Sequence, residues 1–274
     1  MVRTPSRTVT LAVSANPLRV VSTNSGLTIC ERVDGVTTLL LNRLERSNAL
    51  TPELATDLQL AMERASGNAS LRVLVIRGAG SRSFCGGYDL HNVTTGVRDD
   101  ALGSMLRYLR TMPVPTVAVL NGHAVGAGLD LASSCDLRIA RTGAKIGLPA
   151  VRIGVAYDAV GLRGILARTG VARRFLLTGE LVDVAEAVGF ADLVCAADSL
   201  DEQLEGIVMK LLAGSPASLE YMSAMIRPYA MPDVSADADW RNRVLDGPDA
   251  AAAAEARSRG TSPIFRQRDV SSSR

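Results

Sequence analysis

Two glycine-bearing segments indicate the fold of this chain: NGHAVGAGLD at residues 121–130 and FCGGYDL at residues 84–90. Each follows an apolar, β-branched run of the kind that forms a buried strand. Glycine lets backbone N–H groups turn inward without interference from a Cβ, and the second segment opens into a helical pattern over 129–135. We therefore expect two inward-facing N–H groups from separate loops, with Asp130 one helical turn beyond them. Such a pair suits the oxyanion of an activated carbonyl, for example a thioester.

Two other interpretations of these segments are open. A glycine-rich turn between strand and helix is common in α/β proteins and often serves tight packing alone. A nucleotide-phosphate site is the usual functional alternative. However, the second segment lacks the third glycine of G-x-G-x-x-G, and G-x-x-x-x-G-K-[ST] occurs nowhere in the chain. The oxyanion interpretation therefore stands beside the purely structural one.

The composition describes a large apolar core with little charge imbalance. Of the 274 residues, 47% are hydrophobic but only 4% are aromatic, which suits buried parallel strands of Val, Ile, Leu and Ala covered by helices. The 30 basic residues nearly balance the 28 acidic ones, so charge provides no argument for a nucleic-acid partner. No apolar run is long enough for a membrane span, so we expect no membrane association.

Cysteine and histidine usage indicates a reducing compartment and no metal site. The four cysteines are widely spaced without a C-x-x-C pair, and there are only two histidines. We therefore expect neither a disulfide framework nor a metal centre, and a cytoplasmic location. These residues are Cys30, Cys85, Cys135, Cys195, His91 and His123.

Strand and helix patterns alternate along most of the chain, which predicts an α/β fold with a parallel sheet. We expect a loose extension over 1–25, a core over 26–195, and a helical oligomerisation region with a tail over 196–274. The pattern predicts wholly helical structure after Val171 and a capping box formed by Ser199 and Glu202. Strands are expected at 37–41, 71–76 and 114–120, and helices at 52–65, 101–110, 200–212, 217–226 and 250–257.

Four motifs, taken together, resemble the crotonase superfamily, the enoyl-CoA hydratase/isomerase family. LNRLERSNAL at 41–50 is similar to the family's L-N-R-P-x-x-x-N-A-L, and the segment at 84–90 to F-x-x-G-x-D-L. NGHAVGAGLDLASSCD at 121–136 resembles N-G-x-A-x-G-G-G-x-[ED]-L-x-x-x-C-D, and LTGE at 177–180 with AEA at 185–187 resembles a later signature. The similarity extends over about residues 28–268.

This resemblance implies a crotonase-like spiral of ββα units whose C-terminal helices pack into trimers or hexamers. It implies an acyl-CoA thioester as substrate, with coenzyme A as part of that substrate and no separate cofactor. The thioester oxygen would accept hydrogen bonds from the backbone N–H groups of Tyr88 and Ala127. The positions that match coenzyme A contacts in the family are Arg46, Ser47, Ala49, Asp89, Leu90, Phe265 and Arg268.

The same resemblance identifies the residues that would carry acid–base chemistry. Family hydratases use two glutamates; the first matches Asp130, but Ala150 stands where the second is expected. Asp158 is a second acid nearby. The family's dienoyl-CoA isomerases have aspartates at the positions of both Asp130 and Asp158 and a glutamate at the position of Ala150, so this chain keeps two of those three acids. The structural alternatives are that Asp158 is a helix N-cap and that Asp130 is an ordinary first-turn acid.

Three functions therefore remain open. The chain could be an isomerase that moves a double bond on an acyl-CoA, with Asp158 or Asp130 carrying the proton. It could be a hydratase that uses Asp130 with an unconventional partner such as Tyr157. It could also be an acyl-CoA-binding protein without catalysis. The missing acid at Ala150 favours the first and third over a standard hydratase, and the acid at 158 favours an enzyme.

Overall fold

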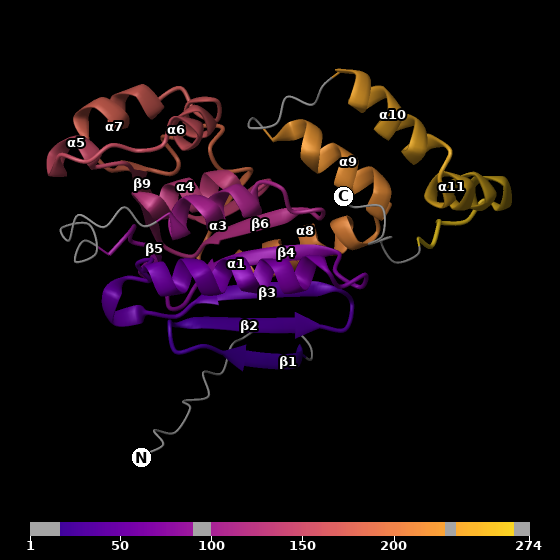
Figure 1. Cartoon of the computed structure of the whole chain (residues 1–274), viewed down its shortest axis with the longest axis horizontal. Helices are drawn as coiled ribbons and strands as arrows, with labels where there is room; N and C mark the ends of the chain where they lie inside the picture. Colours follow the sequence, from indigo (N-terminus) through magenta and orange to yellow (C-terminus); the bar gives the residue numbers. More distant parts are fainter. Residues whose placement is uncertain (1–16, 90–99, 228–233, 266–274) are drawn as a thin grey trace, which may run out of the picture.

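The computed structural model describes residues 17–89, 100–227 and 234–265. A seven-stranded sheet in the order β1-β2-β3-β4-β6-β8-β11 is the framework of the molecule (Figure 1). β1 to β3 are antiparallel neighbours, and from β3 to β11 the strands run parallel. The strands are β1 (Pro17–Ser22), β2 (Leu27–Arg32), β3 (Val36–Leu41), β4 (Val73–Gly78), β6 (Thr116–Leu120), β8 (Leu137–Arg141) and β11 (Leu193–Cys195).

A second, four-stranded sheet in the order β10-β9-β7-β5 lies beside the first. It consists of β5 (Ser83–Cys85), β7 (His123–Val125), β9 (Lys145–Gly147) and β10 (Val182–Asp183). β5, β7 and β9 each follow closely on a strand of the first sheet, and α4 (Ala127–Ser134) and α5 (Ala150–Ile153) follow β7 and β9. The chain therefore repeats a ββα unit, as the sequence predicts.

Alternation along β4 explains how the first sheet is covered on both faces. Leu74 and Ile76 belong to a large apolar cluster with α1 (Pro52–Ser66) and α3 (Ala101–Leu109). Val73 and Val75 belong to a second cluster with α8 (Leu200–Leu212). Because successive side chains of a strand point to opposite faces, α8 covers the face opposite α1 and α3.

The helix predicted over 52–65 is present as α1, so this prediction is confirmed. Thr51 Oγ1 accepts a hydrogen bond from Leu54 N at 3.2 Å, and Pro52 occupies the first turn. Apolar side chains at helical spacing form the buried face of α1, comprising Leu54, Leu58, Ala61, Met62 and Ala65.

The remaining helices form two groups at the same edge of the sheet (Figure 1). α5, α6 (Ala159–Leu166) and α7 (Ala172–Thr178) lie together over α4, whereas α9 (Pro216–Ile226), α10 (Val234–Leu245) and α11 (Pro248–Arg259) extend away from the core. In the described parts of the chain, no helix combines the length and apolar character that crossing a bilayer requires.

Three sequence predictions need correction. Residues 17–22 were expected in the loose extension, but β1 pairs with β2. The region after Val171 is not wholly helical, because β10 pairs with β9 and β11 extends the parallel sheet beside β8. Ser199 stands at the N-cap of α8 but, among the described residues, its side chain makes no capping bond; its hydroxyl contacts Asp198 Oδ1 at 3.3 Å instead.

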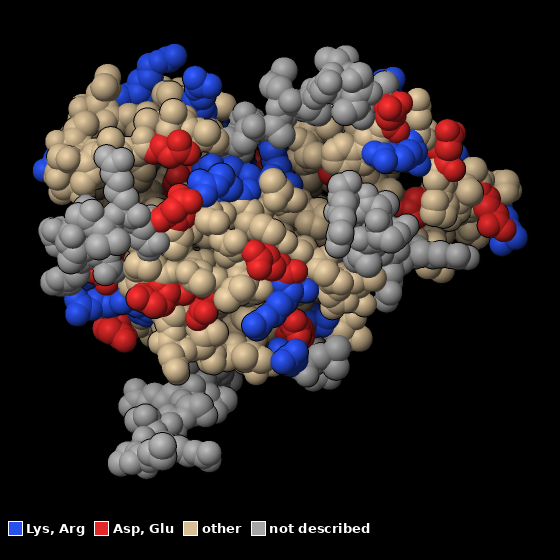
Figure 2. All heavy atoms as spheres, viewed as in Figure 1, with Lys and Arg blue, Asp and Glu red and all other residues tan. Residues whose placement is uncertain are grey.

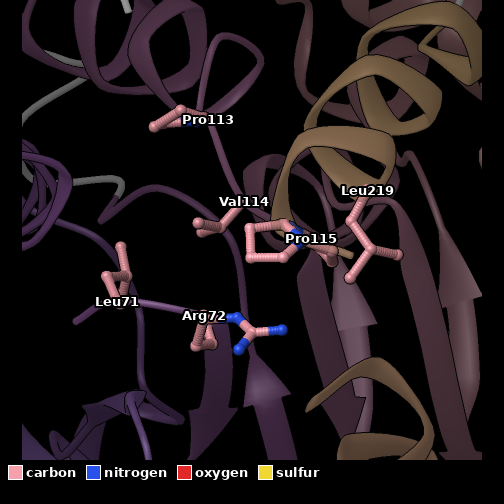
Figure 3. Close-up of a pocket in the computed structure, with 7 residues that line it drawn as sticks. Leu71, Arg72, Pro113, Val114, Pro115 and Leu219 are labelled. Atoms are coloured by element: carbon pink, nitrogen blue, oxygen red, sulfur yellow. The ribbon is translucent and has the colours of Figure 1, made fainter. Parts of the chain in front are cut away.

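A small pocket lies where α9 joins the core (Figure 3). Its lining includes residues that directly precede β4 and β6, together with Leu219 from α9. Arg72 in this lining donates to the carbonyls of Leu212 and Gly214 at the end of α8. The pocket is at the opposite ends of β4 and β6 from the glycine-bearing loops, and its contacts join the C-terminal helices to the core.

Candidate active site

The first glycine-bearing loop is held beside the segment that precedes α1. Gly87 has a φ of +111°, which favours glycine, and its carbonyl accepts a hydrogen bond from Leu50 N at 2.8 Å. Asp89 N in turn donates to Leu50 O at 2.8 Å. Tyr88 lies between these two bonds, so its backbone is fixed by a parallel bridge to Leu50.

Asn48 ties this segment to the turn between β4 and β5. Its side-chain amide is buried and donates to Ala79 O at 3.0 Å and to Ser83 O at 2.8 Å. Its Oδ1 accepts a hydrogen bond from Arg43 N at 3.1 Å. Asn48 also has a φ of +56°, a conformation that asparagine tolerates better than most residues. The N-A-L motif therefore supports the backbone of Tyr88.

The second loop leads directly into α4, with Gly126 as N-cap and Ala127 as the first helical residue. The two loops touch: a Cβ on Gly87 would lie 3.1 Å from Val125 O and 3.8 Å from Ala127 N. Ala127 has a negative φ, because Ser47 and Asn48 are the non-glycine residues of the described chain with positive φ. Gly87, which directly precedes Tyr88, thus lies against the N-terminus of α4, where Ala127 begins the helix. Tyr88 and Ala127 are the two residues predicted to bind a thioester oxygen together.

Asp130 is buried and forms an ion pair with Arg110. Arg110 Nη2 donates to Asp130 Oδ1 at 2.8 Å, and Arg110 Nε donates to Ser134 Oγ at 3.0 Å. The other face of the carboxylate packs so tightly against α6 that a Cβ on Gly161 would clash with it. Burial raises the pKa of Asp130 above its usual value, and the charge of Arg110 opposes that rise.

Asp158 occupies the N-cap position of α6, as predicted, but it does not act as a cap. Within the described structure its side chain makes no capping hydrogen bond, and the side chain is 64% exposed. Its Oδ2 lies 4.0 Å from Arg110 Nη1. The structure therefore brings Asp130 and Asp158 to one guanidinium. Ala150 is the first residue of α5 and contributes no acid.

Tyr157 lies next to the second loop. Its hydroxyl would be 2.8 Å from a Cβ placed on Gly126. Burial, followed by the charge of Asp130, raises the pKa of Tyr157 to about 12, so this hydroxyl is protonated at neutral pH. Cys85, buried behind the first loop, likewise has its pKa raised to about 12 by burial, so its thiol is a poor nucleophile.

Four of the predicted coenzyme A contacts lie in one region of the structure. Ser47 ends the short 3₁₀ helix Leu44–Arg46, and its carbonyl accepts Gly86 N at 2.9 Å. Arg43 joins the region by donating to Ala49 O at 2.6 Å and pairing with Asp89 Oδ2 at 3.3 Å. Arg46 is exposed in the same helix.

The predicted tail contacts come after α11. α11 ends at Arg259, before Phe265, and lies at the opposite end of the molecule from β5 (Figure 1). Leu90 and Arg268 lie outside the described residues.

Two arginines of the site, Arg43 and Arg110, are not among the residues predicted from the sequence. Arg43 belongs to the LNRLERSNAL motif at 41–50. A charged residue within this motif was the feature of the sequence that could have pointed to it. Arg110 is the last residue of the helix predicted over 101–110, a position where arginine usually contacts solvent. Its burial depends on carboxylates that come later in the sequence, so nothing local to Arg110 indicates its role.

Charge over the surface is mixed. On the face shown in Figure 2, acidic and basic side chains are interspersed between neutral areas. In the ranges that the structure describes, no group of three or more His, Cys, Asp or Glu side chains is arranged to hold a metal ion.

Comparison with known proteins places these observations in a family. The family model described as Enoyl-CoA hydratase/isomerase matches residues 31–252. A putative enoyl-CoA hydratase/isomerase of Bacillus subtilis, YngF, is 32% identical over 191 residues, covering 66% of this chain and 74% of the relative. The (E)-benzylidenesuccinyl-CoA hydratase of Thauera aromatica is 35% identical over 195 residues, with the same two shares.

Solved structures agree with this grouping. The crystal structure of an enoyl-CoA hydratase/carnithine racemase from Magnetospirillum magneticum superposes with a TM-score of 0.82 at 28% identity. The match covers 89% of this chain and 96% of that one. The predicted crotonase-like fold is therefore confirmed. This chain belongs to the enoyl-CoA hydratase/isomerase family, the crotonase superfamily.

Proposed function

We propose that this protein is an acyl-CoA isomerase in which Asp158 carries a proton between two carbons of the acyl chain. The N–H groups of Tyr88 and Ala127 bind the thioester oxygen, which acidifies the neighbouring carbon. The observation that carries the proposal is the state of Asp158. It stands at a helix N-cap without capping the helix, so its carboxylate has no structural task there, and it is exposed beside Arg110.

The proton transfer needs one carboxylate. Asp158 removes a proton from the α-carbon of a β,γ-unsaturated thioester, and the electron pair moves onto the thioester oxygen. The resulting dienolate is stabilised by the two backbone donors. The Asp158 carboxylic acid then returns the proton to the γ-carbon, so the double bond moves into conjugation and no atom is added or lost.

The burial of Asp130 supports a different role for this acid. One of its oxygens is bound to Arg110 and its carboxylate packs against α6. A carboxylate enclosed in this way is a poor proton shuttle, because it is buried and one of its oxygens is already bound. With Ala150 at the second glutamate position, the two-acid hydration of the family's standard hydratases lacks one of its acids.

A hydratase is the second candidate, because one observation supports it specifically. The Tyr157 hydroxyl lies beside Gly126 and is protonated at neutral pH, so it could donate a proton during addition of water. The relative from Thauera aromatica is named a hydratase, and the relative from Bacillus subtilis a putative hydratase/isomerase. In this case Tyr157 would replace the missing acid.

A panel of thioesters separates these candidates. Enoyl-, dienoyl- and hydroxyacyl-CoA substrates are incubated with the protein, and mass and ultraviolet absorbance are followed. We expect products of unchanged mass with altered absorbance. A mass gain of one water would favour the hydratase, and binding without conversion across the panel would favour a non-catalytic acyl-CoA-binding protein.

Tyr157→Phe distinguishes the two enzymes further. Under the isomerase proposal, this variant keeps its turnover within a few-fold of the wild type, because the phenolic proton takes no part. A hydratase that relies on this hydroxyl would lose about 10²–10⁴-fold. Initial rates on the best substrate of the panel provide the measurement, with Tyr108→Phe as a control for the loss of a phenol elsewhere.

We also propose that the chain assembles into trimers or hexamers through its C-terminal helices. α8 and α9 carry exposed apolar side chains, including Met209, Met222 and Ile226. Exposed large apolar residues grouped on adjacent helices favour a protein interface. Light scattering coupled to size exclusion should give three or six times the mass of one chain at micromolar concentration; a stable monomer would contradict this proposal.

A further inference from the structure

Arg110 connects three elements of the site through one guanidinium. It follows directly on α3, and its side chain is 6% exposed. Two of its nitrogens bind α4, at Asp130 Oδ1 (2.8 Å) and Ser134 Oγ (3.0 Å). The third, Nη1, lies 4.0 Å from Asp158 Oδ2 at the start of α6.

The planarity of the guanidinium makes this arrangement directional. Asp130 and Ser134 lie one helical turn apart on α4, so two fixed bonds determine where the third nitrogen points. At 4.0 Å the contact with Asp158 is an ion pair and too long for a hydrogen bond. Asp158 is thus attracted toward a defined position while its oxygens stay available to a substrate proton.

The backbone of Arg110 is held as well. Arg227, at the end of α9, donates to Arg110 O at 3.2 Å and to Met112 O at 2.7 Å. Arg227 is itself fixed by a buried double contact with Asp136, at 2.7 Å to each carboxylate oxygen. The segment that carries Arg110 is therefore anchored at both its side chain and its main chain.

We propose that Arg110 is a positioning residue that holds the Asp158 carboxylate oriented toward the substrate, with Asp130 and Ser134 as its anchor. The inference rests on the proposed role of Asp158. The titratable groups around this ion pair are Asp130 on α4, Tyr157 before α6 and Cys85 at the end of β5. Asp130, Tyr157 and Cys85 are all acidic groups, so Arg110 supplies the positive charge among these four residues. The anchoring of Arg110 also gives Asp130 a role at a buried position where it is a poor proton shuttle.

Two variants test the proposal through the pH dependence of proton exchange on the acyl chain. Arg110→Met removes the cation, so the acid limb of the rate profile should move to higher pH by about 0.2–0.7 unit, the size expected from a long ion pair with an exposed carboxylate. Arg110→Lys keeps a cation but loses the planar fork, so its limb should stay closer to the wild type while the plateau rate falls about tenfold.

Arg138→Lys is the matched control. Arg138 is also a buried arginine paired with an aspartate, since its Nη2 lies 2.8 Å from Asp192 Oδ2, and it contacts carbonyls near the end of α4. We expect this variant to lose stability without any shift of the acid limb. A purely structural role for Arg110 would give the same pattern in Arg110→Lys and Arg110→Met, and that result would overturn the proposal.

A second readout does not depend on catalysis. In protein labelled with ¹³C at the aspartate carboxyl carbon, the Asp158 signal is identified by its loss in Asp158→Asn and then followed against pH. The midpoint of this signal should move to higher pH in Arg110→Met and by a smaller amount in Arg110→Lys. If Arg110→Met does not fold, the lowered plateau rate of Arg110→Lys tests the proposal instead. An unchanged midpoint and an unchanged rate would refute the role of Arg110. If the midpoint shifts but Asp158→Asn keeps full activity, Asp158 is not the base of the reaction, although Arg110 still acts on the Asp158 carboxylate.

Discussion

Ala127→Pro should lower turnover by at least about 10²–10³-fold, because it removes one of the two backbone donors proposed to bind the thioester oxygen. The fold should survive this change. Ala127 is the first residue of α4, the helical position at which proline is tolerated, since no intrahelical bond needs its N–H. Steady-state rates and circular dichroism of the purified variant provide the measurement.

Ala127→Gly is the matched control for that experiment. It keeps the N–H and removes only a methyl group, so turnover should stay within a few-fold of the wild type. Full activity of a folded Ala127→Pro variant would show that the oxyanion is bound elsewhere.

Asp158→Asn should lower turnover by about 10²–10⁴-fold, the usual cost of losing a general base. Stability should change by at most ~1 kcal/mol, because the side chain is largely exposed and its ion pair with Arg110 is long. Asparagine is close in shape and still suits a helix N-cap. Initial rates are compared with the midpoint of chemical unfolding.

Asp100→Asn is the control. Asp100 also stands at a helix N-cap where, among the described residues, its side chain makes no capping bond. It too is exposed and pairs with an arginine, Arg107, at 2.6 Å. Its replacement should leave turnover unchanged. Normal turnover in Asp158→Asn would mean that Asp158 has only a structural role. It would favour the hydratase that uses Tyr157, or an acyl-CoA-binding protein without catalysis.

Local patterns predicted the parts of the fold that local chemistry determines. Thr51 and Pro52 mark the start of α1, and the glycines at 126 and 128 mark the start of α4. Gly128 is required there because a Cβ would overlap the backbone of Cys85. The starts of the two helices depend on residues close in sequence, so the sequence is enough to predict them, whereas the contact between Gly128 and Cys85 forms only in the folded chain.

The predictions that failed depend on partners far away in sequence. β10 and β11 comprise two and three residues, too few for a periodic pattern, and they exist because β9 and β8 offer free edges. β1 pairs with β2 across a turn, although its basic, proline-containing sequence resembles a loose extension. Arg110 was missed for the same reason, since Asp130 and Asp158 reach it only in the folded chain.

The proton transfer itself is tested most directly by isotope incorporation. Wild-type protein and Asp158→Asn are incubated in D₂O with a β,γ-unsaturated acyl-CoA, and the mass and double-bond position of the thioester are determined. We predict that the wild type yields the conjugated thioester with deuterium at the α- or γ-carbon and no added water, and that Asp158→Asn incorporates far less. Equal incorporation by both proteins, or a product that contains an added water, would contradict the proposed chemistry.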